Sequence, residues 1–152
     1  MLRPTALRPL LLALPAALLL ACSSEPPDTH PDKPVTQRRD AFKAMLRITE
    51  PMSTMLKDKR FDADKFARLA DQFAAAREVP WKHFGPDSNY PPTKARPAVW
   101  EKPAEFERRR SEFITATDRL LAAAAARSEE QARSALAAVQ DSCKACHDDF
   151  RR

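Results

Sequence analysis

Residues 128–150 read SEEQARSALAAVQDSCKACHDDF and combine a helix-start signal with a regular apolar pattern. Ser128 stands three positions before Gln131, the arrangement of a capping box. Beyond it, apolar or small residues recur every three or four positions, which places them along one face of a helix. They are Ala132, Leu136, Val139, Cys143, Cys146 and Phe150. This stretch therefore predicts a helix with one face in the core of a helical bundle.

The same helix face carries the strongest chemical signal in the chain, Cys143-Lys144-Ala145-Cys146-His147. The C-x-x-C-H spacing is the attachment pattern of a c-type haem. Two thiols one helical turn apart can form thioethers with the two haem vinyl groups, and the histidine that follows then supplies the proximal iron ligand. We therefore predict one covalently bound haem c, attached at Cys143 and Cys146 and ligated by His147.

Other uses of two cysteines and a histidine fit the sequence less well. A zinc site needs about four ligands, and the remaining histidines, His30 and His83, lie far from the motif in the chain. A redox dithiol usually sits in a βαβ context, which is missing here. A disulfide between Cys143 and Cys146 would strain a regular helix. Metal binding and dithiol chemistry stay open as alternatives to haem.

Periodic apolar residues predict three further helices, from about Thr36 to Lys57, from Asp62 to just before Pro80, and from Pro103 to about Ala126. The chain has a single glycine, which argues against glycine-rich phosphate sites and against folds with many tight turns. We predict an all-α fold, an antiparallel four-helix bundle with a long Pro- and Trp-containing loop between the second and third helices.

Two proline-dependent features of this bundle can be anticipated. Residues 78–103 hold six prolines and both tryptophans, and we expect Trp81, Phe84 and Trp100 to pin this long loop to the bundle. Pro51 falls inside the first predicted helix, where it removes a backbone hydrogen bond. We expect a kink or a short restart of that helix near Thr49.

Residues 1–21 have the layout of an export signal, with basic residues at the start and an apolar run too short to span a bilayer comfortably. The run ends in Leu19-Leu20-Ala21-Cys22, which resembles the lipobox of bacterial lipoproteins. We predict cleavage before Cys22 and lipid modification of that cysteine; an ordinary signal peptide with a chance cysteine is the alternative. Residues 22–35 are rich in proline and charge and are expected to form a tether. These features predict a periplasmic domain, residues 36–152, that meets a membrane only through a lipid anchor.

Three segments of the chain resemble the cytochrome c′ family, the four-helix class of c-type cytochromes. VPWKHFGP at 79–86 resembles the family's Pro-Trp-x-x-Phe-Gly-Pro segment, ARPAVW at 95–100 its Arg-Pro-x-x-Trp segment, and CKACHDDFRR at 143–152 its haem motif and close. The resemblance extends over about residues 36–152. It implies an antiparallel four-helix bundle, commonly a homodimer.

The resemblance also implies a haem environment for particular side chains. Arg38 matches a first-helix arginine that approaches the haem propionates. A register shifted by one residue to Arg39 is rejected, because it would put Lys43 over the iron and break the apolar face of the helix. Phe42, four positions on, matches the side chain over the distal iron face, while Met45 and Met52 match core methionines. Trp81 belongs to the family's loop segment, and Arg151 matches an arginine on the proximal side.

If Phe42 covers the distal face, it cannot ligate the iron, because it has no lone pair. The haem is then five-coordinate and high-spin, and small uncharged diatomics such as NO and CO can bind. We expect a protein that binds such gases, transfers single electrons to a redox partner, or does both. A low-spin haem with a methionine as sixth ligand, from Met45, Met52 or Met55, is the alternative.

Several function classes are not expected. The net charge is +5, and loss of Arg3 and Arg8 with the export signal lowers it by two, to +3, which is too small to indicate nucleic-acid binding. No Ser/His/Asp set or paired-carboxylate site is apparent, so we do not predict an enzyme. Arg108-Arg109-Arg110 is interpreted as a solvated helix face.

Overall fold

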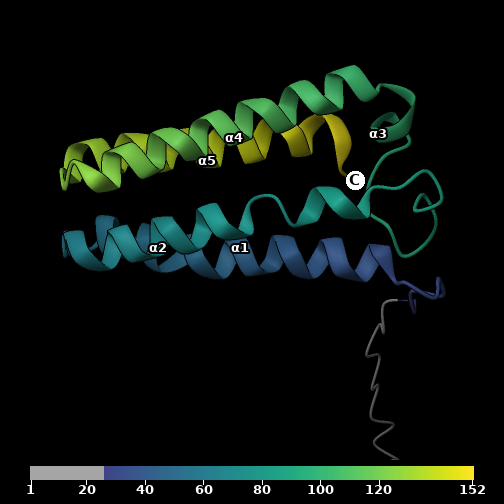
Figure 1. Ribbon diagram of the computed structural model, residues 1–152, viewed down its shortest axis with the longest axis horizontal. Coiled ribbons are helices and arrows are strands. Elements are labelled where there is room, and N and C mark those ends of the chain that lie inside the picture. The colour runs from purple at the N-terminus through teal and green to yellow at the C-terminus, as the bar shows by residue number, and fades with distance from the viewer. Residues whose placement is uncertain (1–25) are drawn as a thin grey trace, which may run out of the picture.

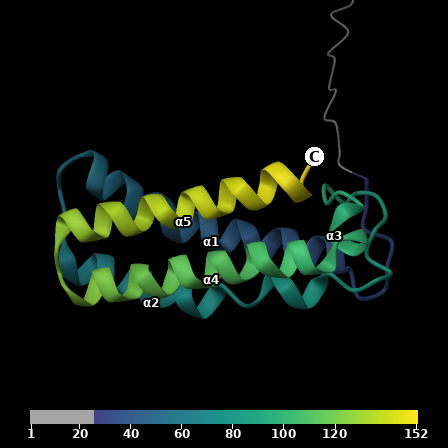
Figure 2. The ribbon, with the colours of Figure 1, turned by 90° about the horizontal axis from the view of Figure 1, so that it is seen from above.

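The computed structural model describes residues 26–152, which form an all-helical bundle. Four long helices lie in two layers, with α1 beside α2 and α4 beside α5 (Figures 1 and 2). The helices are α1 (Pro34–Lys57), α2 (Ala63–Ala76), the 3₁₀ turn η1 (Pro80–His83), α3 (Ala98–Glu101), α4 (Pro103–Ala125) and α5 (Glu129–Phe150). The predicted antiparallel four-helix bundle is confirmed.

Side-chain caps start two of the helices. The Asp62 side chain accepts a hydrogen bond from the Lys65 backbone N–H at 2.9 Å and starts α2. The Ser128 hydroxyl accepts one from the Gln131 N–H at 3.3 Å and starts α5. Proline occupies the first turn of both α1 and α4, where its missing N–H costs no helical hydrogen bond.

Two expectations about α1 differ from the structure. The helix begins at Pro34 rather than Thr36, so the end of the predicted 22–35 tether is helical. It also continues through Pro51 to Lys57, so the restart, one of the two outcomes expected near Thr49, does not occur. One missing backbone hydrogen bond is outweighed here by burial, because Met52 directly after the proline is completely buried and Met55 nearly so.

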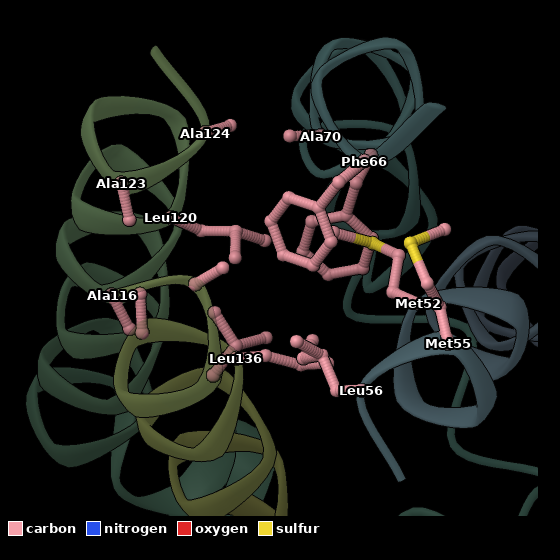
Figure 3. Packing of buried hydrophobic residues seen from close by; sticks show 14 of the residues in the cluster. Met52, Met55, Leu56, Phe66, Ala70, Ala116, Leu120, Ala123, Ala124 and Leu136 are labelled. Atoms are coloured by element: carbon pink, nitrogen blue, oxygen red, sulfur yellow. The ribbon is translucent and has the colours of Figure 1, made fainter. Parts of the chain in front are cut away.

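The bundle is densely packed at the end that carries the α1–α2 and α4–α5 turns. Side chains from both layers point toward one another there (Figure 3). Met52, Phe66 and Leu120 are completely inaccessible to solvent. Small residues on α4 and α5 let these two helices approach closely, and they are Ala116, Ala123, Ala124, Ala132 and Ala135. We call this region the packed end.

The opposite end carries the long loop between α2 and α4, which includes η1 and α3 (Figure 1). The Trp81 indole N–H donates to the Arg77 carbonyl at 2.7 Å, and the Trp100 indole N–H donates to the Gly85 carbonyl at 2.9 Å. Phe84 lies between the two tryptophans, with ring centroids 6.3 and 6.5 Å away. The aromatic residues therefore hold the loop against the bundle, as expected.

No helix within residues 26–152 has the length and apolar character needed to cross a membrane.

Candidate haem site

A cavity of about 310 Å³ opens between α1, α5 and the long loop. Its lining includes every predicted site residue that the structure describes: Arg38, Arg39, Phe42, Trp81, Cys143, Cys146, His147 and Arg151. Cys22 lies outside the described residues. We call this half of the bundle the haem end, to distinguish it from the packed end.

One wall of the cavity is the last part of α5. Cys143, Cys146 and His147 all line it from consecutive turns of that helix. Both thiols are free and partly buried. Burial raises the pKa of Cys143, and burial together with the neighbouring Cys143 raises the pKa of Cys146 to about 11. The two sulfurs are thus protonated thiols at neutral pH, held beside an apolar space.

This environment bears on the alternative uses of the motif. A reactive redox cysteine normally sits where its pKa is lowered, whereas both thiols here have raised pKa values. Within residues 26–152, no three His, Cys, Asp or Glu side chains are grouped as a metal ion would require. Two thiols and an imidazole that face one apolar cavity fit a covalently attached haem better than either alternative.

The imidazole of His147 is kept in its neutral form. Burial, and then the positive charge of Arg151, lower its pKa, so a nitrogen lone pair is available for iron at neutral pH. The Arg151 N–H donates to the His147 carbonyl at 3.0 Å. The chain after α5 is in turn fixed to the long loop, through Arg96 N–H to the Phe150 carbonyl at 2.9 Å and Arg152 N–H to the Lys94 carbonyl at 2.8 Å.

The opposite wall is α1 with the aromatic part of the loop. Phe42 meets Trp81 edge-on, with ring centroids 5.7 Å apart. Trp81 continues onto Phe113 at 5.8 Å. Met45 lies beside Phe42 in the lining and is 5% exposed. The wall that faces the thiols and the imidazole is thus predominantly apolar.

The two neighbouring arginines of α1 have different surroundings. Arg38 is 4% exposed, and its guanidinium donates to the His83 carbonyl, to the hydroxyl and carbonyl of Ser88, and to the Thr93 hydroxyl. Each of these bonds goes to the long loop, so Arg38 holds the loop as well as lining the cavity. Arg39 lies at the mouth, with Nε 3.6 Å from an Asp40 carboxylate oxygen.

The lining also contains three phenylalanines that were not predicted as site residues. Phe106, Phe113 and Phe150 connect to the loop aromatics, with Phe106 5.0 Å from Phe84 and 5.2 Å from Phe150. Phe150 was expected only as a core position of its helix. The only sequence signal that distinguished them was their closeness to the haem motif or to the tryptophan-containing loop.

Met52 and Met55 do not line the cavity. Both are buried in the packed end, where the Met55 sulfur lies 3.2 Å from the Asp62 backbone nitrogen. Of the three methionines considered as a sixth ligand, only Met45 lines the cavity.

Comparison with known proteins identifies the family of this chain. The family model described as Cytochrome C' matches residues 33–151. The chain belongs to the cytochrome c′ family. A cytochrome c' from Alcaligenes xylosoxydans xylosoxydans is 30% identical over 80% of this chain and 95% of its own length. Another, from Halomonas halodenitrificans, is 32% identical over 80% of this chain and 98% of its own length.

Solved structures of cytochrome c′ proteins share the fold. The crystal structure from Rubrivivax gelatinosus has a TM-score of 0.77 and 28% identity over 83% of this chain and 100% of that one. A nitric oxide complex of a cytochrome c prime variant from Alcaligenes xylosoxidans also has a TM-score of 0.77, with 29% identity over 83% of this chain and 99% of that one. A c-type haem is the cofactor that this family implies, and the thiols, imidazole and apolar cavity described above fit it.

Proposed function

We propose that this protein is a periplasmic c-type haem protein that binds small diatomic gases, NO and CO, or exchanges single electrons, or does both. One covalent haem would be attached through Cys143 and Cys146, with His147 as its only axial protein ligand. The observation that carries this proposal is the cavity itself, which has the C-x-x-C-H residues on one wall and Phe42 with its aromatic neighbours on the other. Bound haem supplies an iron centre that changes oxidation state and coordinates gases.

The α1 wall would select what reaches the iron. Phe42 has no lone pair and presents an apolar ring, so it disfavours water and anions. Two hydrogen-bond donors of the cavity lining are engaged elsewhere: the Trp81 indole with the Arg77 carbonyl and the Ser142 hydroxyl with the Val139 carbonyl, both at 2.7 Å. A polar oxygen complex would therefore gain little stabilisation, whereas NO and CO need no such donor.

A solved relative supports the gas ligand. The structure named as a nitric oxide complex of a cytochrome c prime variant from Alcaligenes xylosoxidans has the same fold as this chain. We carry the ligand class over to this protein as part of the proposal, and we regard the protein as a binding or electron-transfer protein rather than an enzyme.

A low-spin electron carrier with a methionine ligand is the second candidate. It depends on Met45, the one methionine of α1 that lines the cavity. Met45 follows Phe42 by nearly one helical turn, so it would need Phe42 to move aside.

The remaining parts of the proposal concern location and partners. The export signal and Cys22 support a periplasmic protein that is anchored by lipid to an envelope membrane. A homodimer, common in the family, is proposed here too, and Leu46, 65% exposed on α1, is an apolar residue available for such contact. The electron partner would be another redox protein, and no nucleic acid is involved.

The visible absorption spectrum of the haem-loaded protein tests the proposal. Broad high-spin ferrous bands that change when CO is added are expected. A sharp low-spin ferrous spectrum that ignores CO would favour the methionine ligand, and Met45→Leu should then convert it to a high-spin spectrum. Absence of covalent haem would contradict both candidates.

The role of Phe42 has its own test. Phe42→Ala should speed CO binding several-fold, because the side chain that crowds the distal side is removed. Leu46→Ala, on the same helix but at the exposed mouth, is the matched control and should leave the rate nearly unchanged. Equal CO binding rates in the wild type and Phe42→Ala would contradict the proposal that Phe42 restricts access to the iron.

A further inference from the structure

The residues before α1 are bound to the long loop instead of leaving the domain as a free tether. The Asp28 carboxylate is the central contact. One of its oxygens accepts a hydrogen bond from the Thr36 backbone N–H at 2.8 Å, in the first turn of α1. The other accepts a hydrogen bond from the Tyr90 hydroxyl, in the loop. A single side chain thus joins the segment, the helix and the loop.

His30 makes a second set of contacts to the same part of the loop. Its ring stacks on Tyr90, with centroids 6.2 Å apart and an interplanar angle of 22°. Nδ1 accepts from the Asp32 N–H at 3.1 Å, which leaves Nε2 as the N–H that faces an Asp87 oxygen 3.3 Å away. The Lys33 N–H donates to the His30 carbonyl at 3.0 Å and closes a turn into α1. We call residues 28–33 the N-terminal strap.

The strap also brings a negative charge toward the buried guanidinium of Arg38. Arg38 is 4% exposed and is surrounded by neutral hydrogen-bond partners from the loop. Burial lowers the pKa of this guanidinium, and the negative charge of Asp28 offsets part of that effect. Asp28 and His30 precede residue 33, where the match to the family model begins. Their contacts therefore come from outside the part of the chain that matches the family.

We propose that the N-terminal strap orients the domain, so that the loop at the haem end faces the lipid surface that holds Cys22. The inference rests on the lipid anchor of the proposed function. If all of residues 22–35 were a free tether, Val35 could move about 45 Å from the anchored residue. Because the chain is bound from Asp28 onward, only the six steps from Cys22 to Asp28 remain, a reach of about 20 Å.

The length of the bundle makes this difference decisive. Helix α1 has 24 residues and is about 36 Å long. A reach of about 20 Å from one end keeps the loop close to the headgroups, and it lets the packed end extend away from them. The cavity mouth shares the loop end, since Lys94 and Arg151 line it. The partner surface of the haem end is therefore the membrane, which apolar gases cross freely.

A footprint of lysine reactivity can test this orientation. Haem attachment consumes Cys143 and Cys146, and Cys22 is then the only thiol in the chain. The haem-loaded protein that begins at Cys22 is coupled to a maleimide phospholipid in vesicles of phosphatidylcholine and phosphatidylglycerol. Exposed lysines are acetylated briefly and quantified by mass spectrometry, and protein with a capped Cys22 in solution serves as the reference.

The chain offers exposed lysines at both ends. Lys82, Lys94 and Lys102 lie at the loop end, and Lys57, Lys59 and Lys65 lie at the packed end. We expect the loop-end lysines to react several-fold more slowly on vesicles and the packed-end lysines to react as in solution. Equal protection at both ends would overturn the proposal.

A variant with the strap released separates the strap from the anchor. Asp28→Asn combined with Tyr90→Phe removes the charge and the hydroxyl that join strap and loop, with little change in shape, and the visible haem spectrum verifies that the site is intact. The difference between the two ends should then largely disappear; full protection in this variant would overturn the role of the strap.

The mass of the native protein, purified from membranes, tests the anchor separately. Lipid at Cys22 supports the proposal. An unmodified Cys22 would contradict the lipid anchor and with it the membrane as partner, whatever the footprint shows. If the native protein is lipidated but lysines at both ends are acetylated at equal rates on vesicles, only the orienting role of the strap is contradicted.

Discussion

The packed end and the haem end are built from the same four helices but differ in how those helices are separated. At the packed end, Met52, Phe66 and Leu120 are inaccessible to solvent and fill the space between the layers. At the haem end, Phe42, Trp81 and Cys143 are only partly buried and surround a cavity of about 310 Å³. Side chains fill the core of the first region, whereas the second leaves a space that side chains do not fill.

This contrast shows how the bundle divides stability from binding. Large side chains interlock at the packed end (Figure 3), where burial contributes most to stability. The haem end relies on an aromatic loop, on Arg38 and on the paired chain end after α5 to hold its walls apart.

Loss of the covalent haem should have the largest effect. Cys143→Ala combined with Cys146→Ala removes both attachment points. Without haem, the apolar walls of the cavity are exposed to water, and the loss of this apolar burial should destabilise the haem end more than any substitution below. Hydrogen exchange measured by mass spectrometry should show rapid exchange in the first half of α1 and the end of α5, with slower exchange at the packed end.

Lys144→Ala is the control for this experiment, because it changes the same motif but keeps both cysteines. Lys144 is exposed and pairs only with Asp148, one turn further along, so its removal should change stability by less than about 0.5 kcal/mol. Uniform exchange over the whole of the haem-free double variant would contradict the division into two regions.

A matched pair of phenylalanine substitutions should give the next largest effect. Phe66 is 0% exposed, and Phe66→Ala should lower the free energy of unfolding of the haem-loaded protein by about 3–5 kcal/mol. Phe42 is only partly buried, and Phe42→Ala should cost about 1 kcal/mol. Denaturant titration followed by far-UV circular dichroism measures both. Equal losses would mean that the two ends support the fold alike.

The packed end was the part of the fold most accessible from sequence. Helix positions, the caps at Asp62 and Ser128 and the core spacing depend on local patterns, and these patterns were present in the chain. Pro51 was the exception, since its local signal for a break was outweighed by the burial of Met52, a tertiary effect. A local sequence pattern indicates what a proline costs a helix, but it does not show how far burial against the other helices offsets that cost.

The haem end was predictable only in part. The C-x-x-C-H spacing identified Cys143, Cys146 and His147, and family resemblance supplied Phe42, Trp81 and the arginines, all of which line the cavity. The hydrogen bonds from Arg38 to Ser88 and Thr93 join residues about fifty positions apart, and no local pattern encodes them. For the same reason the contacts of Asp28 were not expected in a proline-rich segment that looked like a tether.

Arg38 should be the most important single side chain for the loop. Arg38→Met keeps the length of the side chain but removes four hydrogen bonds to the loop, those to the hydroxyls of Ser88 and Thr93 and to the carbonyls of His83 and Ser88. We expect a loss of about 3 kcal/mol and faster proteolysis of residues 78–102. Denaturant titration and limited proteolysis of the haem-loaded protein measure these effects.

Lys43→Met is the matched control for Arg38→Met. Lys43 also lines the cavity mouth on α1, but its side chain is exposed, so its replacement should change stability little. Similar losses for the two variants would show that positive charge at the mouth, rather than the hydrogen bonds of Arg38 to the loop, stabilises the haem end.

The smallest predicted effect is the titration of Tyr90, which reports on the strap at the haem end. Partial burial of the phenol and its hydrogen bond to Asp28 raise the pKa of Tyr90 to about 12, from an ordinary value of 10.0. Since the folded pKa is the higher one, this contact contributes its full stability below pH 10.0 and loses it as the pH rises through about 12. The hydrogen bonds from Tyr90 and Thr36 have the opposite effect on Asp28 and, despite its partial burial, lower its pKa below 3.8, so that its contribution is lost only in acid, as the pH falls through the lowered pKa.

Tyr90 is the only tyrosine in the chain, so the ultraviolet absorbance of tyrosinate reports this residue alone. In an alkaline titration of the haem-loaded protein, the tyrosinate signal should be half-developed near pH 12 in the wild type. In Asp28→Asn it should move back toward pH 10, because the charged acceptor is gone while the packing around the ring is kept. Far-UV circular dichroism at each pH confirms that the helices are still formed. A midpoint near pH 10 in both proteins would mean that Asp28 and Tyr90 are not hydrogen-bonded in solution. The strap, residues 28–33, would then not belong to the haem end.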